Sequence, residues 1–424
     1  MKSDLQEAIH LTWELMDAET RVNNWLTSHQ IGGEESLASS TEQKIEQPLC
    51  VVSIGKAALP MFEGARKYLR EIKDYLVITA EGYGVSDDPK VLLSSHPFPD
   101  HRALAAAQAL VSFLQKNEGA ELLFLISGGS SALVELPLAG IEMGTINELN
   151  QTLVSSGLDI EQINQLRSQL SQIKGGQLRR WIDSPKITQL SLSDVAGDNP
   201  AVIGSGLLFE SSVTREPSGS LFTLMQDKVN QLSQQGLNRH GQPLTQTSER
   251  KTLPEVAHFC IGNSLLAAEL LGQELVLKTE LPLQTLTEIN LSVEHTINWF
   301  DEQLSKGDKG IWIAHGETTL ALPAEVRGSG GRNCHLALSM ARQIAGDDNL
   351  VFASFGSDGQ DGSAPAAGAL VDGNDWLRLN DVGVNPNVLL STFNSYTGLE
   401  AINACLKLKK GRTNVRDLMV AIRW

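Results

Sequence analysis

The sequence contains little cysteine. Its four cysteines, Cys50, Cys260, Cys334 and Cys405, are scattered singly along 424 residues, with no C-x-x-C pair. This spacing argues against a disulfide framework and against a zinc site built from paired cysteines. We therefore expect reduced thiols in a cytoplasmic protein.

Basic residues and long apolar runs are also scarce. Thirty-four Lys and Arg against fifty Asp and Glu give a formal net charge of −16. A nucleic acid or an anionic membrane would be repelled by most of such a surface, so we expect neither as a partner. No uncharged apolar run reaches the roughly 18 residues that a transmembrane helix needs. Acids interrupt residues 1–22, which show helical spacing, so we expect neither a signal peptide nor an Arg-rich transit peptide there.

What the chain has instead is an alternation of short apolar runs with amphipathic stretches. The runs LCVVSI, YLVITA, KVLLSS and ELLFLI follow one another from residue 49 to residue 126. Such runs between helical stretches are typical of buried parallel strands in βαβ units. The alternation resumes after residue 257 with HFCIGN, GIWIAH, ETTLAL and LVFASF. The second half is therefore also α/β, and the pattern leaves open whether its sheet is mixed.

A segment from residue 211 to about residue 253 separates these two halves, because it is poor in aliphatic runs and rich in Gln, Ser and Thr. We expect an N-terminal domain over residues 1–245 and a C-terminal domain over residues 255–424. Ligands of open α/β sheets bind beyond the carboxyl ends of strands. An acidic chain must hold an anionic ligand there by backbone N–H groups with one or two placed cations.

Two strand-to-helix turns in the first half suit an anion. In the first, an apolar strand ends in Gly55 and Lys56, and a lysine at a helix start suits a phosphate or carboxylate. The Walker A spacing is absent, and an exposed first-turn lysine is the alternative. In the second, two glycines let the backbone approach a ligand and three hydroxyls supply donors, although a tight turn with a serine cap explains the same letters. This second turn comprises Ser127, Gly128, Gly129, Ser130 and Ser131.

Two later turns of the first half offer a cation and a pair of acids. Lys174 and Gly175 follow an amphipathic stretch, where a glycine is also the ordinary end of a helix. Asp194 and Asp198 lie four residues apart after an apolar run. Such carboxylates can act as a base, hold Mg²⁺ through oxygen or water, or cap turns.

The second half contains the densest glycine loop. Gly330 and Gly331 precede Arg332 and Asn333 at the start of a helical run, and an arginine there can stabilise the charge of a transferring phosphoryl group. A hairpin tip is the alternative. Asp358 and Asp361 lie three apart between glycines in residues 356–362, without the twelve-residue pattern of a calcium loop.

The order of these turns resembles one family, the class II glycerate kinases. These glycerate 2-kinases have a C-terminal part called the MOFRL domain, and members also carry the name hydroxypyruvate reductase. The resemblance spans nearly the whole chain after residue 50. It is carried by SIGKAALPM (53–61), SSHPFPD (94–100), LISGGSSALVELPLAG (125–140), INQLRSQLSQIKGGQL (163–178), SLSDVAGDNPAVIGSG (191–206), HGETTL (315–320), GSGGRNCHLAL (328–338), GSDGQDGSAPAAGALVD (356–372) and GRTNVRDL (411–418).

The resemblance implies ATP-dependent phosphorylation of D-glycerate, or of a closely related small hydroxy acid, to the 2-phosphate with the help of Mg²⁺. It implies a Rossmann-like N-terminal domain and a MOFRL domain with the active site in the cleft between them. The expected catalytic groups are Lys56, Arg332 and Asp194. The expected nucleotide contacts are Ser127, Gly128, Gly129, Ser130, Ser131, Lys174, Gly175, Gly330, Gly331 and Asn333, and the expected metal ligands are Asp194, Asp198, Asp358 and Asp361.

Two alternative functions remain at this point. An NAD(P)H-dependent hydroxypyruvate reductase would need a G-x-G-x-x-G fingerprint with a downstream acid, which the chain lacks. A divergent, non-catalytic homologue that binds a nucleotide or sugar acid is suggested by departures from the family pattern at Ser130, His315, Cys334 and His335. The retention of all three expected catalytic groups favours the kinase. The oligomeric state is open.

Overall fold

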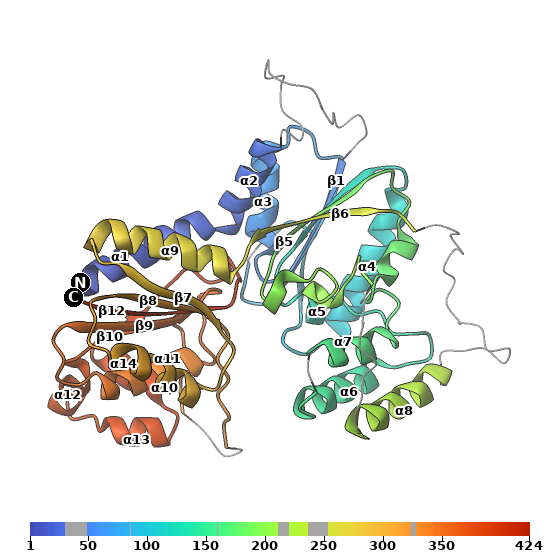
Figure 1. Ribbon diagram of the computed structural model, residues 1–424. Helices are drawn as coiled ribbons and strands as arrows, with labels where there is room; N and C mark the ends of the chain where they lie inside the picture. The colour runs from blue at the N-terminus through green and yellow to red at the C-terminus, as the bar shows by residue number, and fades with distance from the viewer. Residues whose placement is uncertain (30–48, 85, 159, 211–219, 236–252, 324–327) are drawn as a thin grey trace. The chain divides into compact units, whose positions relative to one another are not determined.

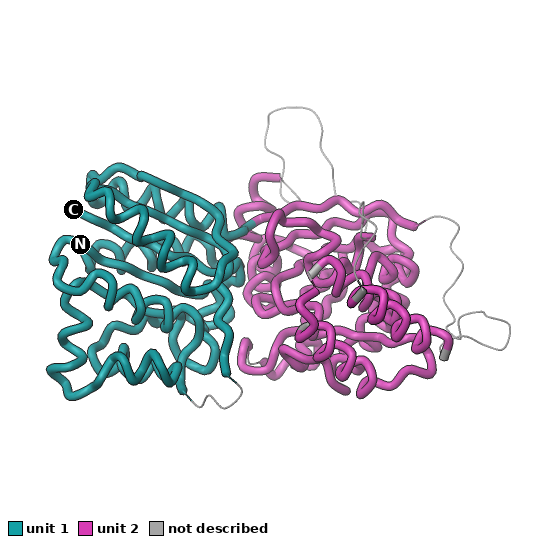
Figure 2. Tube along the Cα trace, turned by 60° about the horizontal axis from the view of Figure 1, so that its bottom comes forward, with its two compact units in different colours: residues 1–17, 262–424 teal, residues 18–261 magenta. Residues whose placement is uncertain are grey.

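The computed structural model describes residues 1–29, 49–84, 86–158, 160–210, 220–235, 253–323 and 328–424. The chain divides into two compact units (Figure 2): unit 1 comprises residues 1–17 and 262–424, and unit 2 comprises residues 18–261. In the described parts, no helix combines the length and the apolar character that crossing a membrane requires.

Unit 2 contains a six-stranded sheet in the order β3-β2-β1-β4-β5-β6. The pairs β1–β2, β2–β3, β1–β4 and β4–β5 are parallel, as the apolar runs predicted. This order turns back between β1 and β4, which makes the carboxyl ends of these two strands the topological switch point where ligands of such sheets bind. The strands are β1 (Leu49–Ile54), β2 (Asp74–Ala80), β3 (Val91–Ser94), β4 (Glu121–Ile126), β5 (Ile187–Leu192) and β6 (Val256–Gly262).

Alternate residues of the central strands bury one face of this sheet under α4. Cys50, Val52 and Ile54 of β1 pack in one cluster with Ala107 and Leu110 of α4. A separate apolar cluster joins α6, α7 and α8. The helices of unit 2 are α2 (Ala18–Ser28), α3 (Ala58–Tyr68), α4 (His101–Lys116), α5 (Ser130–Leu133), α6 (Met143–Ser155), α7 (Ile160–Ser168) and α8 (Ser220–Gln235), with 3-10 turns η1 (Gln177–Trp181), η2 (Ala196–Asp198) and η3 (Ile203–Ser205).

Unit 1 contains a second six-stranded sheet, in the order β11-β10-β9-β12-β8-β7. Only β7 and β8 pair in parallel, so this sheet is mixed. The run at residues 317–322, read as apolar from the sequence, forms only an isolated bridge from Thr319 to Ser292. The strands are β7 (Leu283–Ile289), β8 (Gly310–Gly316), β9 (Leu350–Gly356), β10 (Gly368–Asp372), β11 (Cys405–Leu406) and β12 (Asp417–Arg423).

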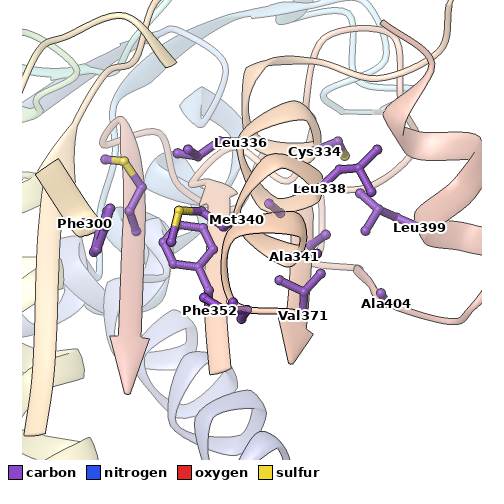
Figure 3. Packing of buried hydrophobic residues seen from close by; sticks show 14 of the residues in the cluster. Phe300, Cys334, Leu336, Leu338, Met340, Ala341, Phe352, Val371, Leu399 and Ala404 are labelled. Atoms are coloured by element: carbon purple, nitrogen blue, oxygen red, sulfur yellow. The ribbon is translucent and has the colours of Figure 1, made fainter. Parts of the chain in front are cut away.

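Helices cover both faces of this mixed sheet. In Figure 1, α1 and α9 lie on one face, and α10 to α14 lie on the other. The second interface is well packed: the ring of Phe300 meets that of Phe352 edge-on at 5.0 Å, beside Met340 and Ala341 (Figure 3). These helices are α1 (Lys2–Met16), α9 (Ser264–Thr279), α10 (Val293–Leu304), α11 (Arg332–Gln343), α12 (Asp375–Asp381), α13 (Pro386–Ser391) and α14 (Ser395–Ala401).

The N-terminal helix α1 belongs to unit 1, which differs from the expected contiguous domains 1–245 and 255–424. Its apolar face includes Leu5 and Ile9, both fully buried, and Trp13, whose ring lies 5.5 Å from that of Phe355. Lys2 also binds the buried Asp375 at 2.5 Å. An amphipathic pattern shows that a helix buries one face, but not which sheet receives it. Much of the expected 211–253 boundary lies outside the described residues, and its described part forms α8.

We expect Ile9→Ala to destabilise unit 1 by about 2–5 kcal/mol, because it removes a fully buried side chain and leaves a cavity. Urea denaturation followed by circular dichroism measures the change. Glu14→Ala, at an exposed position of the same helix, is the matched control. Equal unfolding midpoints for the two variants would show that α1 is not an integral part of the core.

Candidate functional site

The two predicted anion turns of unit 2 meet at the switch point. The backbone N–H of Lys56 donates to the carbonyl oxygen of Gly128 at 2.9 Å, and the N–H of Ala57 donates to Ser127 Oγ at 3.0 Å. Gly55 has φ +138°, and a Cβ there would lie 2.1 Å from Ser127 Oγ. Glycine is therefore required at position 55 for the two turns to approach this closely.

The 127–131 turn leaves several donors unused. Gly128 is buried, and no described residue accepts a hydrogen bond from the N–H of Gly128 or Gly129. The hydroxyl of Ser130 is also buried without a described partner. Because buried N–H groups are nearly always paired in proteins, these donors mark a place for an oxygen-rich ligand.

The side chain of Lys56 lies over the same turn. A Cβ on Gly129 would stand 3.2 Å from Lys56 Cγ and 3.1 Å from His96 Cδ2, so the lysine stem packs directly on this glycine. Its Nζ lies 5.3 Å from the centre of the Tyr83 ring. The turn thus combines N–H donors that have no described partner with a positive charge, which is the combination that binds phosphate.

The two acids after β5 lie at the same edge of the sheet, because β5 runs parallel to β4 with Ser191 opposite Ile126. Asp194 and Asp198 are both half-buried. Burial lowers the pKa of the nearby His258, and the charge of Asp198 offsets part of that shift. Within the residues that the structure describes, no group of three or more His, Cys, Asp and Glu side chains could hold a metal.

The turn at Lys174 and Gly175, expected as a nucleotide contact, has partners inside unit 2. Lys174 is only 1% exposed, and its ammonium is paired with the equally buried carboxylate of Glu135. The N–H of Gly175 donates to the carbonyl of Ser205 at 3.0 Å. Both the cation and the backbone donor are therefore used inside unit 2.

In unit 1, the glycine loop before α11 is occupied by an acid of the chain itself. Asp361 accepts hydrogen bonds from the N–H groups of Gly331 at 3.0 Å, Asn333 at 3.0 Å and Cys334 at 2.7 Å. It therefore caps α11, although it comes from the loop after β9. A Cβ on Gly331 would lie 2.3 Å from the Asp361 carboxylate, which explains the glycine.

This cap engages several groups that were expected from the sequence to bind a nucleotide or a metal. The expected metal ligand Asp361 instead satisfies the helix start, and Gly331 and Asn333 give their N–H groups to it. The side chain of Asn333 accepts from Ser354 Oγ at 2.6 Å, and the N–H of Gly330 donates to Ser363 Oγ at 3.3 Å. The donors that would bind a nucleotide are therefore engaged, because a loop 28 residues farther along folds back over them.

Arg332 is held in place by two acids. Its Nε and Nη2 contact the carboxylate of Asp417 at 2.5 and 3.1 Å, and its Nη1 lies 2.7 Å from Glu317. Asp417 begins β12 and lies opposite Gly316 of β8 and Gly356 of β9, so the ends of three strands place it beside α11. Asp417 was not predicted as a site residue. The sequence marks it only by its position directly before the apolar run LMVAI.

The ionisation of this pair depends on burial. Burial lowers the pKa of Arg332, but the attraction of Asp417 and Glu317 outweighs it, so the net shift is upward and the guanidinium stays charged. Burial raises the pKa of Asp417 to about 6, because it outweighs the attraction of Arg332. The ion pair is therefore complete at neutral pH and weakens in mild acid.

If Asp361 is a helix cap, Asp361→Asn should destabilise the protein by about 0.5–2 kcal/mol, because a charged acceptor for three N–H groups is lost. The urea midpoint should fall by the same amount with and without added Mg²⁺. Asp308→Asn, at an exposed position, is the control. A loss of stability seen only when Mg²⁺ is present would restore the metal-ligand role.

Comparisons with known proteins identify the family of the chain. Residues 4–235 match the family model described as a domain of unknown function, DUF4147, and residues 310–417 match the MOFRL family. The chain is 32% identical to the D-glycerate 2-kinase of Thermotoga maritima over 88% of its own length and 90% of that protein. It is 29% identical to the glycerate 2-kinase of Pyrococcus horikoshii, with 99% of this chain and 97% of that one covered. The crystal structure of a Thermotoga maritima glycerate kinase superposes with a TM-score of 0.81 at 27% identity, covering 100% of this chain and 99% of the other. The chain therefore belongs to the glycerate 2-kinase family, and it combines a DUF4147 domain with a MOFRL domain.

Proposed function

We propose that this protein is an ATP-dependent kinase that phosphorylates D-glycerate at its 2-hydroxyl group to give 2-phosphoglycerate. The observation that carries the proposal is the cluster at the β1–β4 switch point. There Lys56 lies over a turn in which the N–H groups of Gly128 and Gly129 and the hydroxyl of Ser130 have no described partner. The names of the Thermotoga maritima and Pyrococcus horikoshii relatives support the same reaction.

Phosphoryl transfer depends mainly on positioning and on neutralising phosphate charge, and the chain offers groups for both. We assign Lys56 and the 127–131 turn, with Ser127 and Ser131, to the binding of phosphate oxygens. We assign Arg332 to the charge that develops on the transferring group. Its planar guanidinium suits phosphate oxygens, and Asp417 and Glu317 fix its orientation. Asp417 is thus a positioning residue.

The acids suit a magnesium ion that arrives with the nucleotide. Mg²⁺ takes oxygen ligands and in kinases is held by phosphates, water and only one or two carboxylates. Asp194, which follows β5 at the same edge as the 127–131 turn, and Asp198 provide such ligands, and Asp358 provides one after β9. When bound, the ion neutralises phosphate charge. Asp194 is the carboxylate that we place nearest to the reaction.

The first prediction from this function concerns the two cations. The wild-type protein should release ADP from ATP only when both D-glycerate and Mg²⁺ are present. Lys56→Ala and Arg332→Ala should each lower kcat by about 10²–10⁴-fold, because charge on the transferring phosphoryl group is no longer neutralised. A coupled ADP-release assay measures this.

Arg180→Ala, at an exposed position, is the control and should keep wild-type turnover. NADH oxidation with hydroxypyruvate should stay at background. NADH consumption would point to the reductase, and release of ADP with another hydroxy acid but not with glycerate would change the substrate. A protein that binds ATP without any turnover would be the non-catalytic homologue.

The second prediction concerns pH. Because the pKa of Asp417 is raised to about 6, its carboxylate holds Arg332 above that pH and releases it as the pH falls. We expect kcat/KM of the wild type to decline below about pH 6. Asp417→Asn should have lower activity throughout and should lack this inflection, whereas Asp308→Asn should keep it. An unchanged inflection in Asp417→Asn would assign it to another group.

A further inference from the structure

Unit 2 holds a buried polar cluster that the proposed transfer of phosphate does not use. We call it the α7 cluster, and it consists of Glu135, Asn150, Asn164, Arg167 and Lys174. Asn164 and Arg167 lie one turn apart on α7 and so share a face of that helix. Of these residues, only Lys174 was singled out from the sequence, and its charge is taken by Glu135.

The α7 cluster carries one positive charge too many. Lys174 and Glu135 neutralise each other, and both are almost fully buried. The guanidinium of Arg167 adds a second cation, and its hydrogen bond goes from Nε to the neutral amide oxygen of Asn150 at 2.7 Å. Among the described residues, no carboxylate forms an ion pair with Arg167.

A cation without an ion-pair partner among the described residues is costly in a partly buried place. Burial lowers the pKa of Arg167, and Glu135 is near enough to offset part of that shift, but arginine keeps its proton in proteins. A cation removed from water without an acidic partner destabilises the fold. A ligand carboxylate would supply the missing charge and would match the two-pronged geometry of a guanidinium.

A chain of hydrogen bonds connects the α7 cluster to the proposed phosphate site. Ser131 Oγ, in the 127–131 turn, lies 2.8 Å from Ser205 Oγ, and Ser205 Oγ donates to Asn164 Oδ1 at 3.0 Å. Ser130 Oγ, which has no described partner, packs against Gly204: a Cβ on that glycine would lie 2.6 Å from it. The chain of hydrogen bonds ends at Asn164, one helical turn from Arg167, so the surplus cation lies on the face of α7 that this chain reaches from the turn that we assign to phosphate.

We propose that Arg167 binds the carboxylate of a small 2-hydroxy acid substrate. The inference rests on the proposed function, since that function requires an acceptor with a carboxylate next to its hydroxyl group. Arg167 would hold the acid end, while Lys56 and the 127–131 turn hold the phosphate. Arg167 is then a residue that selects acids over neutral polyols.

Kinetics test this role directly. Arg167→Gln should raise the KM for D-glycerate by about 10–100-fold, the effect of losing charge-assisted hydrogen bonds. The KM for ATP should change by less than about twofold. Arg167→Lys should lie in between, because it keeps the charge but not the fork of donors. Arg180→Gln, the exposed control in the same unit, should behave as the wild type.

Thermal denaturation separates binding from a structural role. Without ligand, Arg167→Gln should melt at or above the wild-type temperature, because it removes a partly buried cation that forms no ion pair with a described carboxylate. Glu135→Gln should melt lower, because it leaves Lys174 without its acid. D-glycerate should raise the melting temperature of the wild type but not of Arg167→Gln. A lower melting temperature for Arg167→Gln, with equal changes in both KM values, would show a structural role and overturn the inference.

The two proposals can fail separately. If the wild type releases ADP with D-glycerate and Arg167→Gln keeps both its KM and its stabilisation by D-glycerate, the inference is wrong and the kinase stands. If the wild type shows no turnover, the kinase is wrong, and melting in D-glycerate, lactate and hydroxypyruvate still tests Arg167. Stabilisation of the wild type but not of Arg167→Gln would support a carboxylate site, and no stabilisation of either would reject it.

Discussion

The close approach of two turns at the switch point is the constraint on which the candidate site depends. The turn after β1 can approach the turn after β4 only because residue 55 has no side chain, since a Cβ there would overlap Ser127. Once the turns meet, the backbone of Lys56 bonds to Gly128, and the lysine stem packs on Gly129. The orientation of the remaining N–H groups follows from this contact. A charged side chain is thereby brought together with N–H donors that have no partner among the described residues. Such a local arrangement is what an acidic protein requires to hold an anion.

The chain supplies partners for many of its other anion-binding groups. Asp361 caps α11, Glu135 neutralises Lys174, and Asp417 clamps Arg332. Lys174 and Arg332 both look like anion-binding cations in the sequence, but their acidic partners give them different surroundings. Lys174 becomes part of the interior, whereas Arg332 remains about one-third exposed and is only oriented by its partners. Arg167 is the contrasting case, because it is partly buried and no carboxylate among the described residues forms an ion pair with it.

The parallel sheet of unit 2 could be predicted from the sequence. Its central strands, such as β1 and β4, are buried on both faces, and their sequences are therefore continuous apolar runs. The strands of the mixed sheet in unit 1 were harder to predict. Its strand β7 is largely exposed or half-buried, with mixed composition. Nothing local shows that β12, the last strand in the chain, lies between β8 and β9. Strand order depends on pairing between distant segments, which a pattern within one segment does not specify.

The sequence by itself determined which turns are candidates for ligand binding, because glycine, lysine and acidic residues that follow apolar runs can be identified from the order of residues alone. It also determined the family, through collinear motifs. Only the tertiary structure decided which of these groups bind each other and which have no described partner. Asp361 lies 30 residues from Gly331 and Asp417 lies 85 residues from Arg332, yet each pair is in hydrogen-bond contact. The physical reason is that the free energy of a charged group depends on its neighbours in space, and folding chooses those neighbours without regard to their separation along the chain.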